Sequence, residues 1–324
     1  MKLLFIHRSA ALAETFFCVF CLFSCVRNSG TVGQPSNPPY DHVILLGFDG
    51  LAGAAIDTVA FALPDSLMPN LREMIALGAW TTHKRSVLPT SSAVNWATMF
   101  MGAGPEVHGY IEWDSKAPHF TSAAQGQFPT VFTALKQACP DAVTAATWQW
   151  DGIKYVVDTA SVDVFRGFRG DVDGILEEAH FVADYIMENK PRLGVFTWDY
   201  PDHTGHTLGW YTPDYYNILH ELDRAIGTVK DAVAQAGIAN RTLIIISSDH
   251  GGHKTWHGNP VDSDLFAPLV IYGRGVKQGY EIPVCYQYDV ASTVLYALGL
   301  EQPALWRGVP IESAFETFFL CKNN

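Results

Sequence analysis

The chain has 324 residues, 48% of them hydrophobic and 17% charged, and its net charge is −12. This balance is typical of a globular protein and excludes an intrinsically disordered chain. The basic residues are scattered, so no basic stripe is available to neutralise the phosphates of a nucleic-acid duplex, and we expect no duplex binding.

The first 25 residues have the pattern of an export signal. Lys2 and Arg8 precede an apolar run that leads into Cys25. A charged start, a short apolar stretch and a small residue are typical of a secretory signal, and this run is short for a membrane span. The segment Leu22–Cys25 is similar to a bacterial lipoprotein cleavage box, in which Cys25 becomes the lipidated first residue. We expect export to the periplasm or the cell surface; a cleaved signal, an uncleaved anchor and lipidation of Cys25 all stay open.

Residues 26–40 are polar and rich in Gly and Pro, which predicts a flexible linker. The remainder, residues 41–324, is expected to form a single catalytic domain. It contains three cysteines, Cys139, Cys285 and Cys321, which lie far apart and include no C-x-x-C spacing. A disulfide framework and a thiolate zinc site are therefore not supported.

Short apolar runs bounded by turn residues predict buried parallel strands. Such runs lie at Val43–Phe48, Gly194–Trp198, Leu243–Ser247 and Pro268–Tyr272. Helical patterns lie between them, with the clearest helix expected from Pro213 to Ala236 and another over Val172–Glu188. Alternation of strands and helices indicates a mostly parallel sheet with helices on both faces. The stretch around 105–170 is expected to form an elaboration over the sheet.

Acidic and imidazole side chains follow three of these predicted strands. Asp49 follows the first, Asp202 and His206 follow the second, and a further set follows the third, comprising Asp249, His250, His253 and His257. Ligands bind beyond the carboxyl ends of the strands in such a sheet. A single Asp after a strand is usually a turn or cap residue. The three histidines within eight positions are harder to explain by packing, and mixed carboxylate and imidazole ligation predicts a zinc site.

A cluster of hydroxyl residues, Thr90, Ser91 and Ser92, precedes a predicted helix. Taken alone, such a cluster is most often a helix cap, and a nucleophile is the less frequent explanation. The segment GAGPEVHG follows at 102–109.

The order and spacing of these segments resemble the alkaline phosphatase superfamily, in particular its nucleotide pyrophosphatase/phosphodiesterase branch in a compact bacterial form. The resemblance covers residues 42–312. It rests on six segments, which are Asp49-Gly50, PTSSAVNW at 89–96, GAGPEVHG, PDHTGH at 201–206, SDHGG at 248–252, and the closing pieces from Tyr288 to Pro310. It implies an alkaline phosphatase-like α/β fold, a three-layer αβα sandwich with a mostly parallel central sheet.

The resemblance also implies two zinc ions and a serine nucleophile. Ser92 is expected to be the catalytic residue, with Ser91 and Thr90 as fallback candidates, because the family's nucleophile stands three residues before an Asn, here Asn95. One ion would be held by Asp202, His206 and His257, and the other by Asp49, Asp249, His250 and the Ser92 oxygen. The choice of His257 over His253 rests on its His-Gly context.

Asn95 and Trp113 are expected to contact the substrate. Trp113 stands where the diesterase branch has an Asn that holds a phosphoryl oxygen, and a Trp offers one N–H donor and a large apolar face. The last zinc ligand, His257, also comes earlier in the chain than the family's distant C-terminal His.

The sequence therefore predicts a phosphodiesterase or pyrophosphatase that acts on a small phosphorylated substrate through a phosphoserine, with no protein partner implied. Two alternatives stay open, which are a phosphomonoesterase of the same fold and a surface binding protein with a vestigial metal site. A sulfatase is rejected, because the segment from Ser92 to Trp96 lacks the Pro and Arg of the C/S-x-P-x-R pattern.

Overall fold

The computed structural model describes residues 38–62, 67–111 and 128–316. The predicted signal segment at 1–25 with Cys25, most of the predicted linker at 26–40, and Trp113 lie outside the described residues. In the described part of the chain, no helix combines the length and the apolar character needed to cross a bilayer.

An eight-stranded sheet forms the centre, in the order β4-β3-β5-β1-β6-β7-β2-β8. Strands β4, β3, β5, β1 and β6 run parallel, whereas β7 runs antiparallel to both β6 and β2. The strands are β1 (His42–Phe48), β2 (Ala79–Arg85), β3 (Thr144–Trp148), β4 (Val164–Gly167), β5 (Leu193–Trp198), β6 (Thr242–Ser247), β7 (Phe266–Gly273) and β8 (Tyr280–Glu281). The expected mostly parallel sheet is confirmed.

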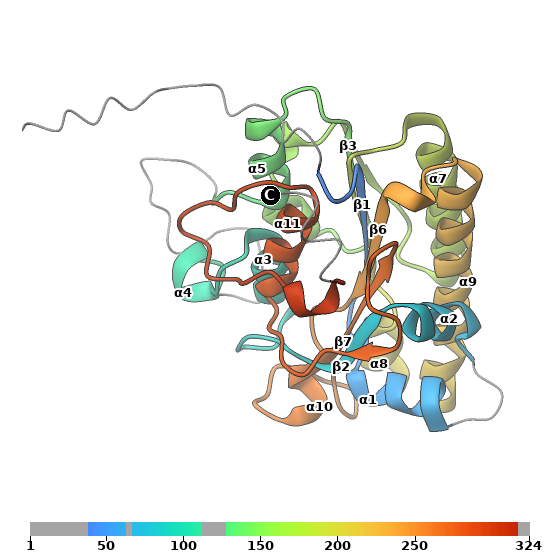
Figure 1. Ribbon diagram of the computed structural model, residues 1–324. Helices are drawn as coiled ribbons and strands as arrows, with labels where there is room; N and C mark the ends of the chain where they lie inside the picture. Colours follow the sequence, from blue (N-terminus) through green and yellow to red (C-terminus); the bar gives the residue numbers. More distant parts are fainter. Residues whose placement is uncertain (1–37, 63–66, 112–127, 317–324) are drawn as a thin grey trace, which may run out of the picture. The chain divides into compact units, whose positions relative to one another are not determined.

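Helices cover both faces of this sheet, with α2, α7 and α9 on one side and α3, α5 and α11 on the other (Figure 1). The helices are α1 (Gly53–Ile56), α2 (Pro69–Leu77), α3 (Ser92–Met101), α4 (Pro105–His108), α5 (Val131–Ala138), α6 (Ile153–Val156), α7 (Val172–Asn189), α8 (Asp202–Leu208), α9 (Pro213–Gln235), α10 (Asp262–Leu265) and α11 (Asp289–Ala297). The three-layer αβα sandwich is therefore the observed architecture.

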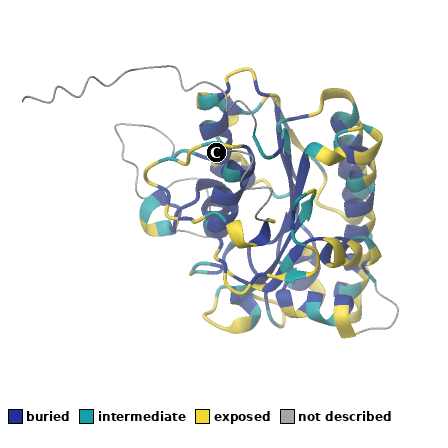
Figure 2. Cartoon of the chain, viewed as in Figure 1, coloured by how far each residue is buried: buried dark blue, intermediate teal, exposed yellow. Residues whose placement is uncertain are grey.

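Strand β1 shows why both faces are buried. Val43 and Leu45 pack into the core on the α3 side, whereas Ile44, Leu46 and Phe48 pack into the core on the α9 side. Alternate residues of a strand point to opposite faces, so a strand covered on both sides must be apolar throughout. Burial is continuous along β3, β5 and β6, and Figure 2 shows buried residues in the centre of the sheet and on the inner faces of the helices.

The long helices begin and end where local chemistry dictates. The Thr212 hydroxyl accepts from Tyr215 N (3.3 Å) at the start of α9, and Pro213 occupies the first turn. The Asp171 carboxylate accepts from Gly174 N (2.8 Å) at the start of α7. Gly237, with φ of 71°, follows the end of α9.

The stretch around 105–170 differs from the expectation in part. Residues 144–148 and 164–167 form β3 and β4, which extend the sheet beyond β5 rather than lying over it. β3 has the sequence TAATW, in which small and hydroxyl side chains replace the branched apolar residues of the other strands. Its burial therefore leaves little trace in the hydrophobic pattern.

Candidate metal centre and nucleophile

The carboxyl ends of β5, β1 and β6 meet at one edge of the sheet, because these three parallel strands are neighbours. The chain segments that follow them lie close together. Asp202 N donates to Asp49 O (2.9 Å), and a Cβ on Gly50 would lie 2.8 Å from the Asp202 Cα. Gly50 has a φ of +67°, so both its backbone conformation and this close approach require glycine.

One group of candidate ligands joins α8 to the loop after β6. Asp202 and His206 stand one turn apart on α8, and His206 Nε2 lies 3.3 Å from Asp202 Oδ2. His257 Nε2 lies 3.7 Å from Asp202 Oδ1 and 3.1 Å from His206 Nε2. One ligand atom from each of the three side chains lies within 4.8 Å of the others, which is a spacing that a single ion can bridge.

A second group surrounds Ser92. His250 Nε2 lies 3.5 Å from Asp49 Oδ1, 3.3 Å from Asp249 Oδ2 and 3.2 Å from Ser92 Oγ. Ligand atoms of Asp49, His250 and Asp202 also fall within 4.8 Å of one another. Asp202 thus borders both groups, whereas the sequence-based prediction placed it in one of them.

The three histidines share one hydrogen-bonding arrangement. Each Nδ1 hydrogen-bonds to a backbone carbonyl oxygen. The partners are Thr255 O for His206 (3.0 Å), Gly251 O for His250 (2.7 Å) and Thr90 O for His257 (2.7 Å). A carbonyl can only accept, so each Nδ1 carries a hydrogen, and Nε2 is the ring atom that faces the site as a possible metal ligand. This is the arrangement that orients imidazoles for metal binding.

Burial sets the charge state of these groups. Burial, followed by the neighbouring carboxylates, Asp249 foremost, holds the pKa of Asp49 and of Asp202 well above the ordinary value. Burial raises the pKa of Asp249 to about 6 and lowers the pKa of His250 and His257 to about 3. The site therefore gathers acidic groups beside neutral imidazoles, and a bound cation would offset the cost of ionising the carboxyl groups.

The donor set fits zinc by a test independent of family. Asp202 Oδ1 and Asp249 Oδ2 are buried and have no hydrogen-bond partner in the described structure. Such orphaned oxygens are rare in proteins unless an ion or water satisfies them. Two unpartnered carboxylate oxygens among inward-facing imidazole nitrogens match the ligands that zinc takes.

The geometry separates the three hydroxyl residues. Ser92, the first residue of α3, is partly exposed and its Oγ lies 3.3 Å from Asp49 Oδ1. Thr90 is buried and its Oγ1 accepts from Gly258 N (2.8 Å), while Ser91 is buried with no partner for its Oγ. Of the three hydroxyls, only that of Ser92 hydrogen-bonds with the candidate ligands. His253 is likewise set apart, because its Nδ1 lies 2.6 Å from Asp264 Oδ1.

Asn95, which the sequence analysis expects to contact the substrate, has its side-chain amide bonded to the backbone. It is fully buried, and its Nδ2 donates to the carbonyl oxygens of Val87, Pro89 and Ser91 (3.2, 3.1 and 3.1 Å). Its Oδ1 accepts from Val87 N (2.8 Å). Both ends of the amide are thus bonded to the backbone of the loop before α3.

Lys84 is fully buried behind the site. Its Nζ donates to Ser248 O (2.8 Å) and to Gln287 Oε1, and burial lowers its pKa to about 8. Gln287 Nε2 in turn donates to Asn95 O (3.2 Å). This network joins the ligand-bearing loop after β6 to α3. No sequence pattern predicts it, because a Lys in a strand is normally at the surface.

Two indoles also support the site, and neither role was predicted from the sequence. Trp96 Nε1 donates to Asp49 Oδ2 (2.9 Å), and Trp210 Nε1 donates to Gly50 O (2.9 Å). The Trp210 ring also packs edge-on against His206, with ring centroids 5.3 Å apart. The sequence feature that could have indicated the role of Trp96 is its position one turn after Ser92.

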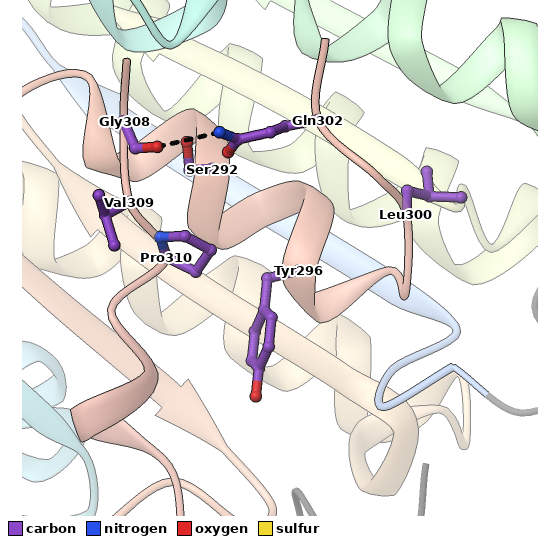
Figure 3. A pocket seen from close by; sticks show the side chains of 7 residues that line it. All are labelled: Ser292, Tyr296, Leu300, Gln302, Gly308, Val309 and Pro310. Carbon is purple, nitrogen blue, oxygen red and sulfur yellow. Dashed lines mark hydrogen bonds between the residues drawn. The ribbon is translucent and has the colours of Figure 1, made fainter. Parts of the chain in front are cut away.

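A separate pocket of about 280 Å³ lies beside α11, and none of the candidate ligands lines it. Gln302 Nε2 donates to Gly308 O (3.2 Å) across it, with Ser292 and Tyr296 on the helix side (Figure 3). Its lining carries no ionic or imidazole side chain, so we assign it no part in the chemistry.

Fold and site together define an α/β sandwich protein with a candidate metal centre at the carboxyl edge of its sheet. Residues 43–269 match the family model of type I phosphodiesterase / nucleotide pyrophosphatase. Because this match covers most of the chain, the protein belongs to that family, within the alkaline phosphatase superfamily, which confirms the resemblance seen in the sequence.

Named relatives and a solved structure agree with this placement. The chain is 26% identical over 238 residues to venom phosphodiesterase of Macrovipera lebetinus, covering 69% of this chain and 27% of the relative. It is 25% identical over 240 residues to mouse ectonucleotide pyrophosphatase/phosphodiesterase family member 3, covering 68% and 26%. Murine ectonucleotide pyrophosphatase / phosphodiesterase 5 in complex with AMP superposes with a TM-score of 0.68 at 14% identity, over 85% of this chain and 100% of that one.

The chain spans about a quarter of the length of the curated relatives it matches. At 14% identity, the likeness to the solved structure establishes the shared fold alone.

Proposed function

We propose that this protein is a two-zinc phosphodiester or pyrophosphate hydrolase in which Ser92 is the nucleophile. The observation that carries the proposal is the convergence of three imidazole Nε2 lone pairs and orphaned carboxylate oxygens beside the Ser92 hydroxyl. Asp202, His206 and His257 would hold one ion. Asp49, Asp249, His250 and Ser92 would hold the other, with Asp202 on the border between them.

Zinc in such a site supplies charge neutralisation at the phosphoryl group and lowers the pKa of a bound hydroxyl or water. The chain's own residues supply position. Ser92 is held at the start of α3 with its Oγ 3.3 Å from Asp49 Oδ1 and 3.2 Å from His250 Nε2. Each imidazole is fixed by its carbonyl partner, so the constellation needs little reorganisation when a substrate arrives.

The reaction then runs in two displacements. The Ser92 oxygen forms a bond to phosphorus as the bond to the leaving alcohol or phosphate oxygen breaks, and the Ser92 proton ends on that leaving group. Water attacks the phosphoryl-serine in the second step, which releases the phosphate product and returns a proton to Ser92 Oγ. The net change is the addition of one water across one phosphoester or phosphoanhydride bond.

A diester or pyrophosphate substrate is favoured over a monoester. A monoester carries an additional negative charge, which a monoesterase meets with a cation beside the nucleophile. Lys84, a buried ammonium of this region, is committed to Ser248 O and Gln287 Oε1. The names of the relatives, which include phosphodiesterase and nucleotide pyrophosphatase, and the AMP bound to the murine structure point to a nucleotide as substrate.

The test compares zinc-loaded wild type, Ser92→Ala and Ser91→Ala on paired aryl phosphate mono- and diesters. Ser91→Ala is the matched control, because it removes the neighbouring hydroxyl, which makes no hydrogen bond with the candidate metal ligands. We expect a diester preference and a fall in kcat of about 10³-fold or more for Ser92→Ala alone. Acid-quenched turnover should leave the phosphoryl group on the peptide that contains Ser92.

Other outcomes have definite meanings. Activity that survives in Ser92→Ala contradicts the nucleophile assignment. A monoester preference would keep the mechanism and change the substrate class. No turnover in any variant, together with little bound zinc, would favour a surface binding protein with a vestigial metal site.

We further propose that the protein acts outside the cytoplasm, because the pattern of residues 1–25 agrees with relatives named venom and ecto enzymes. Cell fractionation tests this, and a shift of Cys25→Ala from the membrane to the soluble fraction would indicate lipidation.

A further inference from the structure

Trp96 contacts the candidate site without offering it a ligand. It stands one turn after Ser92 on α3 and is 1% exposed. Its single hydrogen-bond donor, the Nε1–H, donates to Asp49 Oδ2 at 2.9 Å. The helix that presents Ser92 therefore also holds the carboxylate closest to the Ser92 hydroxyl.

This contact decides which Asp49 oxygen faces the site. With Oδ2 taken by the indole, Oδ1 lies 3.3 Å from Ser92 Oγ and 3.5 Å from His250 Nε2. A carboxylate can otherwise turn about its last torsion and exchange the two oxygens. A donor-only group such as an indole N–H fixes one oxygen as its acceptor.

The ring itself has no room to move. A Cβ on Gly47 of β1 would lie 2.5 Å from the Trp96 ring atom Cη2, so the strand leaves a space that the indole fills. Phe100, one turn further along α3, stacks on the Trp96 ring with centroids 5.6 Å apart. The indole is thus held between a strand and its own helix, as a group that positions another residue must be.

We propose that Trp96 is a positioning residue, which locks the Asp49 carboxylate so that Oδ1 and the Ser92 oxygen face the same ion. The proposal rests on the proposed function for the identity of that ion. The lock itself is a property of the metal-free protein.

The experiment compares Trp96→Phe with Trp306→Phe. Trp306 is a matched control, because it is also buried, at 3% exposure, packs against Gly102 at the end of α3, and donates Nε1 to a backbone carbonyl, Pro129 O (3.1 Å). Both variants keep a six-membered ring and lose one buried hydrogen bond. Zinc affinity is measured by chelator competition, and kcat and KM with a diester.

We expect Trp96→Phe alone to weaken one of the two zinc sites by about 10- to 100-fold and to lower kcat with little change in KM. Equal zinc affinity in the two variants would overturn the proposal. If Trp96→Phe fails to fold, Gly47→Ala supplies the same test, because the added methyl group displaces the indole ring, and with it the N–H, from its position beside Asp49.

A second measurement uses no metal and no substrate. Exchange of the Trp96 indole hydrogen, followed by NMR in metal-free protein, should be faster in Asp49→Ala than in wild type and unchanged in Asp249→Ala. Unchanged exchange in Asp49→Ala would overturn the lock. If wild type binds no zinc while this exchange difference is present, the proposed function fails and the lock stands.

Discussion

The Nε2 atoms of His206 and His257 lie 3.1 Å apart, and both imidazoles are turned to this position by a backbone carbonyl on Nδ1. Two lone pairs that face each other repel unless a proton or a cation lies between them. Asp202 Oδ1, buried and unpartnered, lies beside them at 3.7 Å from His257 Nε2. This pair is the feature of the described structure that most directly indicates a metal ion.

Zinc should therefore stabilise the folded protein. At 100 times its dissociation constant, a ligand that binds only the native state adds about 2.7 kcal/mol, which raises the melting temperature of a chain of this size by about 5 °C. We expect a chelator to remove this increase and His257→Ala to abolish it. His220→Ala, an exposed histidine bonded to Leu67 O, should retain it. An equal response of both variants would contradict the assignment.

Lys84→Met should destabilise the fold through the partners that Lys84 leaves behind. The side chains have similar length, but Ser248 O and Gln287 Oε1 would lose a buried donor. We expect a loss of about 2–4 kcal/mol in the free energy of unfolding. Lys230→Met removes a Lys from a partly exposed pair with Glu73 (2.6 Å) and should cost about 1 kcal/mol or less. Urea denaturation that shows the same loss in both variants would refute the role of Lys84.

Glu178 makes stability depend on pH. It is buried in α7, its Oε1 accepts from Thr147 Oγ1, and burial holds its pKa well above the ordinary value. The native state thus keeps a proton that the unfolded chain releases at about pH 4.3, so this stabilisation is complete below that pH and is lost as the pH rises through the native pKa.

Glu178→Gln keeps the hydrogen-bonding shape and cannot ionise. We expect it to be close to wild type in stability at pH 4 and more stable at pH 9, by about 1.4 kcal/mol for each unit between the two pKa values. Denaturation curves at the two pH values test this. Glu188→Gln, an exposed position on the same helix, should show no such trend. A difference between wild type and Glu178→Gln that does not change with pH would contradict it.

Asn95→Ala should act on stability before it acts on substrate binding. The amide holds the backbone of Val87, Pro89 and Ser91, so its removal leaves several buried groups unpaired. We expect a loss of about 2–4 kcal/mol, with the KM of the remaining active protein little changed. Asn189→Ala, at an exposed position, should stay within about 0.5 kcal/mol of wild type. A raised KM at unchanged stability would restore Asn95 as a substrate contact.

Much of the fold could be predicted, because burial on both faces leaves a plain mark on the sequence. The runs at Val43–Phe48 and Leu243–Ser247 match β1 and β6 within a residue, and the helix expected over 213–236 matches α9 at Pro213–Gln235. Strand β2 is not apparent in the sequence, because its residues, AWTTHKR, include a buried Lys84 and an exposed His83. Hydrophobic pattern carries no information about a charge that is satisfied across the sheet.

In the candidate site, too, some features could be predicted from the sequence and others could not. The acidic and imidazole residues that follow predicted strands could be grouped from the sequence, since parallel neighbours place their carboxyl ends together. These are Asp49, Asp202, His206, Asp249, His250 and His257. The sequence does not indicate which groups orient them. The bond from Trp96 to Asp49 joins residues 47 positions apart, and that from Thr90 to His257 joins residues 167 apart. Such pairs depend on how α3 and the loop before it pack against the sheet and the loop after β6, which spacing alone cannot specify.

The central place of β1 in the sheet has a consequence for folding during synthesis of the chain. β1 ends at residue 48, yet its partners β5 and β6 begin at residues 193 and 242. At synthesis rates of about 5–20 residues per second, on the order of 10 s pass between the synthesis of β1 and that of its second partner strand, β6. A strand of sequence HVILLGF without partners is prone to pair with other copies of itself. The strand is therefore open to self-association during synthesis, and the yield of folded protein should depend on the length of this interval as well as on the stability of the finished sheet.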